Sequence, residues 1–394
     1  MTPETEAERG TKKSLVDSLR RVTTSGRYIP EIDGLRFVAI ASVLLYHLEK
    51  MSNITCGTCV SNGGSNPIFF VLLHMGRGVP IFFAISGLVL GLPFAQQHIT
   101  GGPKVGLKAY FLRRVTRLEP PYIINLLMRF PLVVALKHLP VMEVLPHLLA
   151  SLLYLHWLMY GVHPLVHPPS WSLEVEVQFY VLAPLLAVLF FPRPKWARRL
   201  LLVGLIVGFG AVAAHIPEHP ESRYTLSLAW SVQYFLAGLL MADGYITVLP
   251  RIRSSWWWDV VGVPLWYVVF SMSDREAGYW MPALLVVLFI SAFRGKLLNR
   301  FFRNAFVATV GGMCYSIYLT HSLVMDGCYW VFGRVHFLTG FARLYGAGVV
   351  IGLPMVLMVG TVFYVLIERP CMDREWPRKL GRYLRERFAI GVAS

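Results

Sequence analysis

Long apolar stretches follow one another along almost the whole chain, separated by short polar segments that are often basic. A helix needs about 20 mostly apolar residues to cross a bilayer. Eleven stretches predict helices of this kind: residues 34–50, 67–96, 118–136, 143–160, 171–192, 199–215, 225–243, 256–272, 279–293, 305–331 and 340–368. The pattern therefore predicts an all-α polytopic membrane protein.

The composition supports this fold class. Hydrophobic residues make up 55% of the 394-residue chain and charged residues 15%, and the mean hydropathy is +0.54. Soluble proteins carry more charge than this. The formal net charge of +15 would suggest nucleic-acid binding in a soluble protein. Here the lysines and arginines lie between apolar stretches, where they set membrane topology, so nucleic acid is not an expected partner.

The basic segments predict which stretches cross the membrane, because cytoplasmic loops are enriched in lysine and arginine. If all eleven stretches crossed, "PRPKWARR" and every later basic segment would face outward. If residues 143–160 do not cross, all basic segments face the cytoplasm together. That stretch contains Glu143, Pro146, His147 and His156 and precedes the broken sequence "GVHPLVHPPS". We therefore expect about ten transmembrane helices, one interfacial or re-entrant segment and cytoplasmic termini. The alternative, in which 143–160 crosses, violates the charge rule.

Three regions follow from this topology. Residues 1–27 form a polar cytoplasmic tail without the features of a signal peptide, residues 28–370 the transmembrane domain, and residues 371–394 a basic cytoplasmic tail. Cys56 and Cys59 form "CGTC" in a short loop. They could form a disulfide on an oxidising side of the membrane, but a lone CxxC is a weak metal signal. Two loop thiols without a special role are the favoured interpretation.

The stretch "EIDGLRFVAIASVLLYH" carries two ionisable residues in unfavourable places. Arg36 lies at the cytoplasmic edge and His47 eleven residues further on, so they share one helix face about 16 Å apart. Arg36 could bind phosphate through charge-assisted hydrogen bonds, and His47 could act as a general base. Alternatively, Arg36 reaches lipid headgroups and His47 forms an interhelical hydrogen bond.

Six motifs in this order resemble the acyltransferase-3 family of integral membrane acyltransferases. They are "PEIDGLRFVAIASVLLYH" with its Arg, ten residues and His, then "IFFAISG", "RRVTRLEPPY", "PSWSLEVEVQFYVLAPLL", "YSIYLTH" and "IERP", and they cover residues 28 to 370. The resemblance implies transfer of an acyl group from acyl-CoA to a hydroxyl of a glycan, glycolipid, antibiotic or peptidoglycan. It also makes a bacterial cell membrane the expected location.

The segment "RRVTR" places Arg114 and Arg117 on one face of a helical turn, with Arg113 beside them, in a loop predicted to be cytoplasmic. The simplest interpretation is a topology signal. The resemblance favours binding of the CoA phosphates by these three residues together with Arg36, since several negative charges require several donors. The preceding "GGPKVGLK" lacks the spacing of a nucleotide-binding loop.

Glu176 and His321 are expected in the same outer half of the membrane as His47. His321 lies about 22 Å along its helix from the cytoplasmic side. The family motif selects Glu176, which could orient His47 or accept the proton of the acceptor, whereas Glu174 is expected at the outer rim. An interhelical hydrogen bond for Glu176, and a supporting role for His321, are the alternatives.

Five further residues are candidates for substrate binding: Trp171, Ser172, Tyr315, Tyr318 and His74. Packing is the alternative for the two tyrosines, which lie one helical turn apart. The sequence predicts no metal site. Acyl-CoA, most simply acetyl-CoA, is the expected co-substrate, with a hydroxyl-bearing acceptor and the bilayer as partners; assembly into a homo-oligomer stays open.

The expected reaction is direct attack of the acceptor hydroxyl on the thioester, with His47 as general base. An acyl-histidine intermediate is a variant. A transporter or flippase is the main rival, because ionisable residues within helices also mark carriers. A non-catalytic membrane scaffold is a third alternative.

Overall fold

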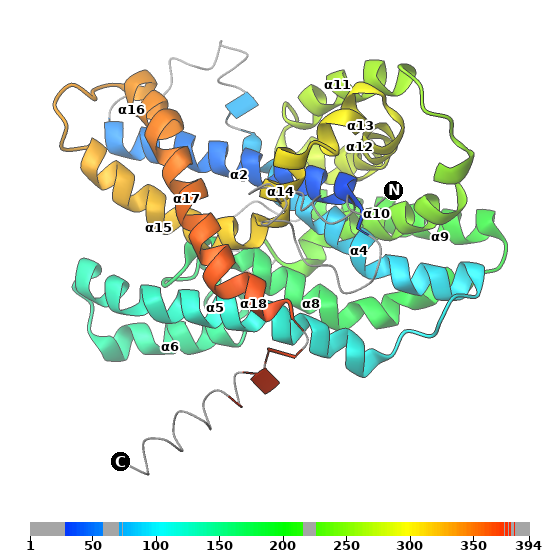
Figure 1. Cartoon of the computed structure of the whole chain (residues 1–394), viewed down its shortest axis with the longest axis horizontal. Coiled ribbons are helices and arrows are strands. Elements are labelled where there is room, and N and C mark those ends of the chain that lie inside the picture. The colour runs from blue at the N-terminus through cyan, green and yellow to red at the C-terminus, as the bar shows by residue number, and fades with distance from the viewer. Residues whose placement is uncertain are drawn as a thin grey trace, which may run out of the picture.

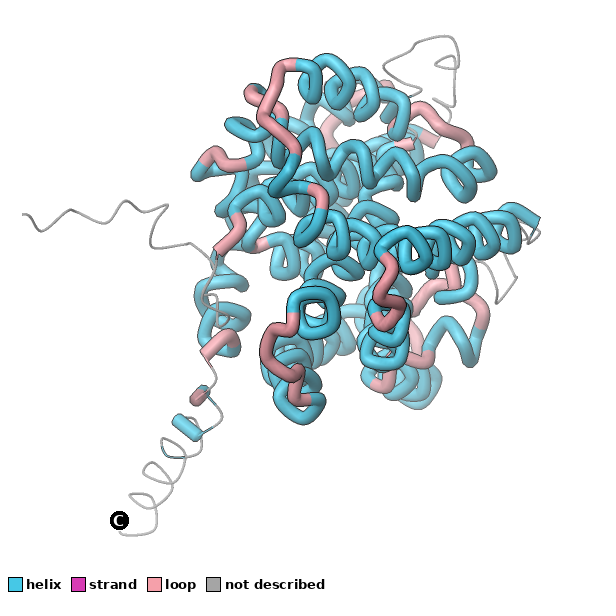
Figure 2. The backbone as a smooth tube through the Cα atoms, turned by 90° about the vertical axis from the view of Figure 1, so that its right-hand side faces the viewer, coloured by secondary structure: helices cyan, strands magenta, loops and turns pink. Residues whose placement is uncertain are grey.

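A computed structural model of the chain describes residues 28–57, 71–72, 74–215 and 226–373, with 375–376, 378–379 and 382. Within these ranges the protein is helical and contains no strand (Figure 2), so the predicted all-α class is confirmed. Cys59, the N-terminal tail and most of the C-terminal tail lie outside the described residues. Predictions about these segments remain predictions. Cys56, at the end of the first helix, is disulfide-bonded, so the favoured interpretation of a loop thiol without a special role is wrong for this residue.

Every predicted apolar stretch coincides with one or more helices. In the first half these are α2 (Pro30–Cys56), α4 (Gly78–Thr100), α5 (Leu107–Lys137), α6 (Val141–Leu152), α7 (His156–Tyr160), α8 (Trp171–Leu186) and α9 (Lys195–His215). In the second half they are α10 (Leu228–Thr247), α11 (Trp257–Val269), α12 (Asp274–Arg294), α14 (Ala305–Gly312), α15 (Cys314–Phe332), α16 (Phe341–Ala347) and α17 (Leu353–Phe363). Two short helices, α13 (Leu297–Phe302) and α18 (Arg369–Cys371), lie outside the predicted stretches.

Short helices of other types extend several of these elements. The 3-10 helices are η2 (Met75–Arg77), η3 (Pro168–Ser170), η4 (Ala187–Phe190) and η5 (Leu249–Arg251), and the π-helices are η6 (Gly348–Gly352) and η7 (Tyr364–Glu368). The two π-helices flank α17. Such segments often occur at functional sites, and η7 ends at a glutamate of the site described below.

Five helical segments of the described chain are long and apolar enough to cross a membrane. They are Met75–Thr100, Pro168–Phe190, Lys195–His215, Asp274–Arg294 and Phe341–Cys371. These are the features of an integral membrane protein. The exact number of ten crossings remains a prediction.

The stretch 143–160 forms two short helices instead of one continuous helix. Helix α6 has 12 residues, about 18 Å, which is too short to cross a hydrocarbon core of about 30 Å. Helix α7 has only five residues and ends at Gly161, whose φ of 68° lies in the left-handed region that glycine adopts readily. Neither helix can cross the bilayer alone.

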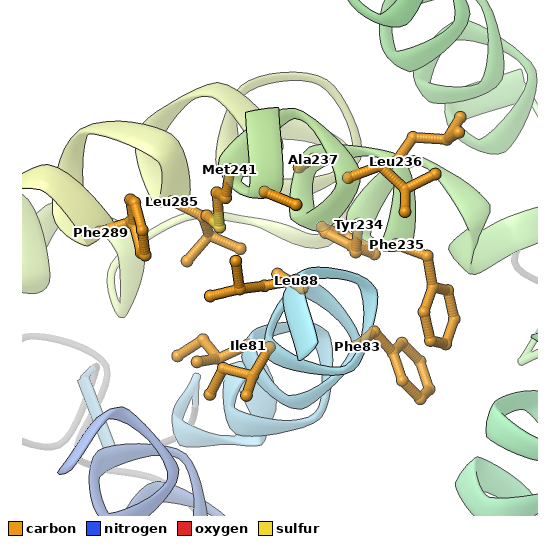
Figure 3. Packing of buried hydrophobic residues seen from close by; sticks show 14 of the residues in the cluster. Ile81, Phe83, Leu88, Tyr234, Phe235, Leu236, Ala237, Met241, Leu285 and Phe289 are labelled. Carbon is orange, nitrogen blue, oxygen red and sulfur yellow. The ribbon is translucent and has the colours of Figure 1, made fainter. Parts of the chain in front are cut away.

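The tightest packing joins α4 to α10. Figure 3 shows Leu88 of α4 pointing toward α10, and the rings of Phe83 and Phe235 stack with centroids 4.7 Å apart. A Cβ atom on Gly87 would overlap the carbonyl oxygen of Phe235. Small residues allow such close approach where lipid provides no hydrophobic drive, which explains the glycine of "IFFAISG".

Helix α2 occupies the centre of the molecule. In Figure 1 it runs across the middle, with α14 near its N-terminal half and α16 near its C-terminal end. A Cβ atom on Gly311 of α14 would overlap the carbonyl oxygen of Asp33, so this glycine lets the two helices touch. Contacts with α4 and α15 follow further along α2. Arg36 and His47 therefore project from a helix that is enclosed by others.

Candidate active site

A cavity lies between α2, α4, α5, α8 and α15. We call it the arginine cavity. Among its lining residues are eight that the sequence singled out: Arg36, Arg113, Arg114, Arg117, Ser172, Glu176, Tyr315 and Tyr318. These residues come from four helices that are widely separated along the chain. Folding thus gathers most of the predicted site around one volume.

Arg36 enters the cavity from the first turns of α2. Its Nη1 atom lies 2.5 Å from Oδ1 of Asp33, one helical turn earlier. Asp33 is buried, so the pair is a short intrahelical ion pair at the cavity wall. The carboxylate fixes the direction of the guanidinium and leaves its other N–H groups available.

The three arginines of α5 do not lie in a loop. Helix α5 begins at Leu107, so the basic segment predicted as a loop is the first part of a long helix. The Arg114 guanidinium lies over the rings of Tyr110 and Tyr180, at 4.9 and 5.4 Å from their centroids. Stacking of this kind orients the planar group.

Arg117 is held by a buried carboxylate instead. Its Nη2 atom lies 3.5 Å from Oε1 of Glu368, which is fully buried at the end of η7. The other carboxylate oxygen accepts hydrogen bonds from the backbone N–H and hydroxyl of Ser316, at 3.1 and 2.6 Å. Glu368 therefore ties α5 to the first turn of α15.

Arg114 and Arg117 each keep an unused donor. Their Nε atoms are buried and have no hydrogen-bond partner among the described residues. A buried N–H without an acceptor destabilises a protein. Both arginines line the arginine cavity, so an anionic group placed there would satisfy these donors.

Glu176 lies in the arginine cavity and accepts a hydrogen bond from the hydroxyl of Ser86 on α4. The hydrogen bonds of the described residues include none between Glu176 and His47. Glu174 does not face an outer rim as the sequence analysis expected. It is buried, and its Oε2 atom accepts the backbone N–H of Trp157 at 2.8 Å, which fastens α7 to α8.

His47 and His321, the histidine pair, meet between α2 and α15. Their ring centroids are 4.9 Å apart, although 274 residues separate them in the sequence. His47 is half-buried and His321 is fully buried. Neither residue lines the arginine cavity. The structure thus brings both histidines together, at a place beyond the cavity wall.

Tyr318 forms the wall between the arginine cavity and the histidine pair. It lines the cavity, and its ring centroid lies 5.7 Å from that of His321. The hydroxyl donates to the carbonyl of Pro169. Because it has only one hydrogen to donate, it accepts from the hydroxyl of Ser172 at 2.8 Å. The ring is therefore held in place from α8 and η3.

Comparison with known proteins identifies the family of the chain. The model of the Acyl_transf_3 family, described as an acyltransferase domain, matches residues 29–367. The chain belongs to the acyltransferase-3 family. The O-acetyltransferase OatA of Staphylococcus aureus strain NCTC 8325 is 23% identical over 406 residues, which cover 93% of this chain and 62% of that protein.

A second S. aureus protein, from strain COL and also named for O-acetyltransferase activity, is 24% identical over 382 residues. The alignment covers 87% of this chain and 57% of that protein. This chain thus spans about three fifths of the length of these curated relatives. No solved structure matches it.

Besides the histidine pair, two predicted residues of the acyltransferase-3 site lie away from the arginine cavity. Trp171 begins α8 and packs against a core cluster that includes residues of α4 and α10. His74 precedes η2 and interacts electrostatically with Glu276 of α12. Within the described ranges, no group of three or more His, Cys, Asp or Glu side chains could hold a metal ion.

Two residues beside the histidine pair are not among those predicted from the sequence. Arg129 of α5 is buried and donates to Asn125, to the carbonyl of Leu319 and to Ser322. An arginine inside an apolar stretch is a recognisable signal of function or of a specific partner. The other is His167, in the irregular segment "GVHPLVHPPS", where no helical period could indicate its neighbours.

Proposed function

We propose that this member of the acyltransferase-3 family is a membrane O-acyltransferase. It moves an acyl group, acetyl or another short chain, from cytoplasmic acyl-CoA to a hydroxyl of a sugar, glycan, glycolipid or antibiotic-type acceptor. The observation that carries the proposal is the convergence of four arginines on one cavity whose wall, Tyr318, contacts His321 of the histidine pair.

The arginine cavity is the proposed donor site. Coenzyme A carries several negative charges on its phosphates, and arginine binds phosphate through paired, charge-assisted hydrogen bonds. Arg36, Arg114 and Arg117 provide oriented guanidinium groups, two of them with buried Nε donors. Arg113 is exposed beside them and adds positive charge at the entrance. With both termini in the cytoplasm, this end of the molecule faces the cytoplasmic pool of acyl-CoA.

The histidine pair is the proposed centre of the reaction. His47 removes the proton from the acceptor hydroxyl, whose oxygen attacks the thioester carbonyl carbon. The carbon–sulfur bond then breaks, and the thiolate of CoA takes up the proton held by His47. Because His47 is only half-buried, an acceptor can reach it, and the ring of His321 lies beside it.

Glu176 acts from within the arginine cavity in this proposal. Its bond to Ser86 fixes the carboxylate near the donor, and no direct bond to His47 is required. A covalent variant, in which His47 first carries the acyl group, uses the same residues. The names of the curated relatives favour acetyl as the acyl group.

The test uses the purified full chain in lipid nanodiscs with acetyl-CoA labelled in the acetyl group. We expect release of CoA and transfer of label to a hydroxyl compound. Arg117→Ala should raise the KM for acetyl-CoA, whereas Arg199→Ala, which removes an ion pair to Asp243 outside the cavity, should not. A chain that never consumes acetyl-CoA but moves a polar solute across vesicles would establish the rival transporter function.

A further inference from the structure

His167 is a fully buried histidine whose ring makes no hydrogen bond within the described protein. Both Nδ1 and Nε2 lack a partner, and the side chain is 0% exposed. Buried polar groups are almost always paired, and an unpaired one in a native structure indicates a ligand, water or a functional role. His321 repeats the feature nearby, since its Nε2 atom is also buried without a partner.

The two imidazoles belong to one cluster. His167 lies close enough to His321, His47 and Arg129 to interact with each electrostatically. The ring of Tyr318 contacts both, with centroids 6.1 Å from His167 and 5.7 Å from His321. Three imidazoles therefore gather at the histidine pair, and His167 had no role in the proposed function.

The backbone holds His167 in place although its ring has no hydrogen bond. The residue precedes Pro168 and Pro169 and has extended dihedral angles, φ −142° and ψ 87°, as a residue before proline prefers. Its carbonyl accepts the N–H of Ser170 at 2.9 Å, and the Pro169 carbonyl accepts the hydroxyl of Tyr318. A rigid segment thus presents an imidazole with unused hydrogen-bonding capacity.

The available donors and acceptors define the chemistry of the ligand. Nδ1 of His321 lies 2.6 Å from the carbonyl oxygen of Tyr318; a carbonyl only accepts, so Nδ1 carries the hydrogen and Nε2 of the neutral ring accepts. A neutral His167 offers one donor and one acceptor. An anion would need donors only and a cation acceptors only, whereas hydroxyl groups provide both.

We propose that His167 and His321 form a binding subsite for an acceptor with several hydroxyl groups, adjacent to the hydroxyl that reacts at His47. The proposal rests on the proposed function and narrows its acceptor to a polyol such as a sugar. One hydroxyl of the acceptor loses its proton to His47. Neighbouring hydroxyls hydrogen-bond the ring nitrogens of His167 and His321.

The decisive variant is His167→Phe, which keeps a planar ring and removes both ring nitrogens. If His167 were only structural, replacing an unpaired polar ring with an apolar one would be neutral or stabilising, and activity would persist. In the proposed role, the variant folds with an unchanged or higher Tm but loses transfer. His156→Phe is the control for replacing a buried histidine, because Nε2 of His156 bonds His147 at 2.8 Å and only its Nδ1 atom lacks a partner.

The assay uses acetyl-CoA as donor and compares octyl β-D-glucoside with octanol as acceptors, in nanodiscs containing the full chain. We expect wild type to prefer the glucoside, and His167→Phe to lose at least about 30-fold in transfer to it, as for loss of one or two hydrogen bonds. Affinity for CoA, measured by calorimetry, should stay within about twofold, since the arginine cavity is untouched. His167→Asn, which retains one donor and one acceptor, should keep part of the activity.

The other outcomes are also informative. Full transfer by His167→Phe, or equal use of both acceptors by wild type, overturns the subsite. Loss of CoA affinity together with transfer in His167→Phe shows a structural role and overturns it as well. Hydrolysis of acetyl-CoA by wild type without transfer to the glucoside rejects the polyol class but keeps the donor site. Absence of both CoA binding and hydrolysis rejects the proposed function itself.

Discussion

The arginines of the arginine cavity and the histidines at the histidine pair differ in the partners that their side chains have. In the cavity, Arg36 and Arg117 are each held by a carboxylate and Arg114 by aromatic rings. Beside the histidine pair, His167 has no partner for either nitrogen and His321 has one for Nδ1 only. Both regions are built from helices that meet α2, and Tyr318 lies between them.

The difference separates binding of the donor from binding and deprotonation of the acceptor. A guanidinium that must receive a phosphate gains from a partner that fixes its plane, because less freedom is lost on binding. An imidazole that must hydrogen-bond a hydroxyl of the acceptor needs a free nitrogen. Unpaired polar groups reduce stability, and natural proteins retain such features mainly at functional sites. The comparison therefore predicts different kinetic effects for the two regions.

The largest expected effect is that of His47→Ala. Loss of a general base typically lowers kcat by about 100- to 10,000-fold. Calorimetry should show an unchanged affinity for CoA, because His47 does not line the arginine cavity. His336→Ala, which changes an exposed histidine, is the control and should behave as wild type. Transfer at the wild-type rate by His47→Ala would remove this residue from the mechanism.

The next effect belongs to the arginines. Arg114→Ala or Arg117→Ala should raise the KM for acetyl-CoA by roughly 10- to 50-fold with kcat within about threefold, as for loss of a charge-assisted bond made equally in ground and transition states. Initial rates at varied donor concentration provide the check. If kcat falls and KM stays constant, the division between binding and chemistry is wrong.

Much of the fold was readable from the chain. Each apolar stretch contains helix, and the stretch 143–160, with Pro146 and two histidines, is divided between α6 and α7. The sequence predicts the "RRVTR" arginines on one helix face, but it places the segment in a loop. Charge alone marks a membrane boundary, and it does not show that helix α5 continues through the boundary to Leu107.

Contacts between helices were harder to predict from the sequence. Spacing along α2 placed Arg36 and His47 on one face, but it could not show that Glu176 would bond Ser86 on α4. Glu368 lay in the recognised "IERP" motif, yet its bond to Arg117 crosses 251 residues. The proline-rich segment around His167 has no period at all. Such partners depend on how helices are arranged, which one sequence does not specify.

Glu368→Gln tests whether the carboxylate positions Arg117. Two effects compete: losing the ion pair frees the guanidinium, whereas removing a negative charge favours phosphate binding. The pair is part-buried, with one contact of 3.5 Å. We therefore expect the lost orientation of Arg117 to have the larger effect and the KM for acetyl-CoA to rise about fivefold. A lower KM would show that Glu368 instead competes with the donor. Ser316→Ala is the control, because it removes a bond to Glu368 and leaves its charge.

Tyr318→Phe has the smallest expected effect. It tests the boundary between the arginine cavity and the histidine pair. The change leaves the ring in place but removes the bonds to Pro169 and Ser172, which should lower stability by about 1–2 kcal/mol. Transfer should fall only about twofold to threefold, since no reacting group is lost.

Hydrolysis of the thioester tests whether Tyr318 forms a wall between the two regions or is only a packing residue. If Tyr318 limits the passage of water between the histidine pair and the arginine cavity, its loosening admits water, and hydrolysis of acetyl-CoA without acceptor should increase relative to transfer. Tyr315→Phe offers a matched comparison. Its hydroxyl donates to the carbonyl of Leu118 at 2.8 Å and it lines the same cavity, but it forms no bond to the segment that carries His167. The ratio of hydrolysis to transfer should therefore rise in Tyr318→Phe alone; an equal rise in both variants would mean that the two regions share one compartment.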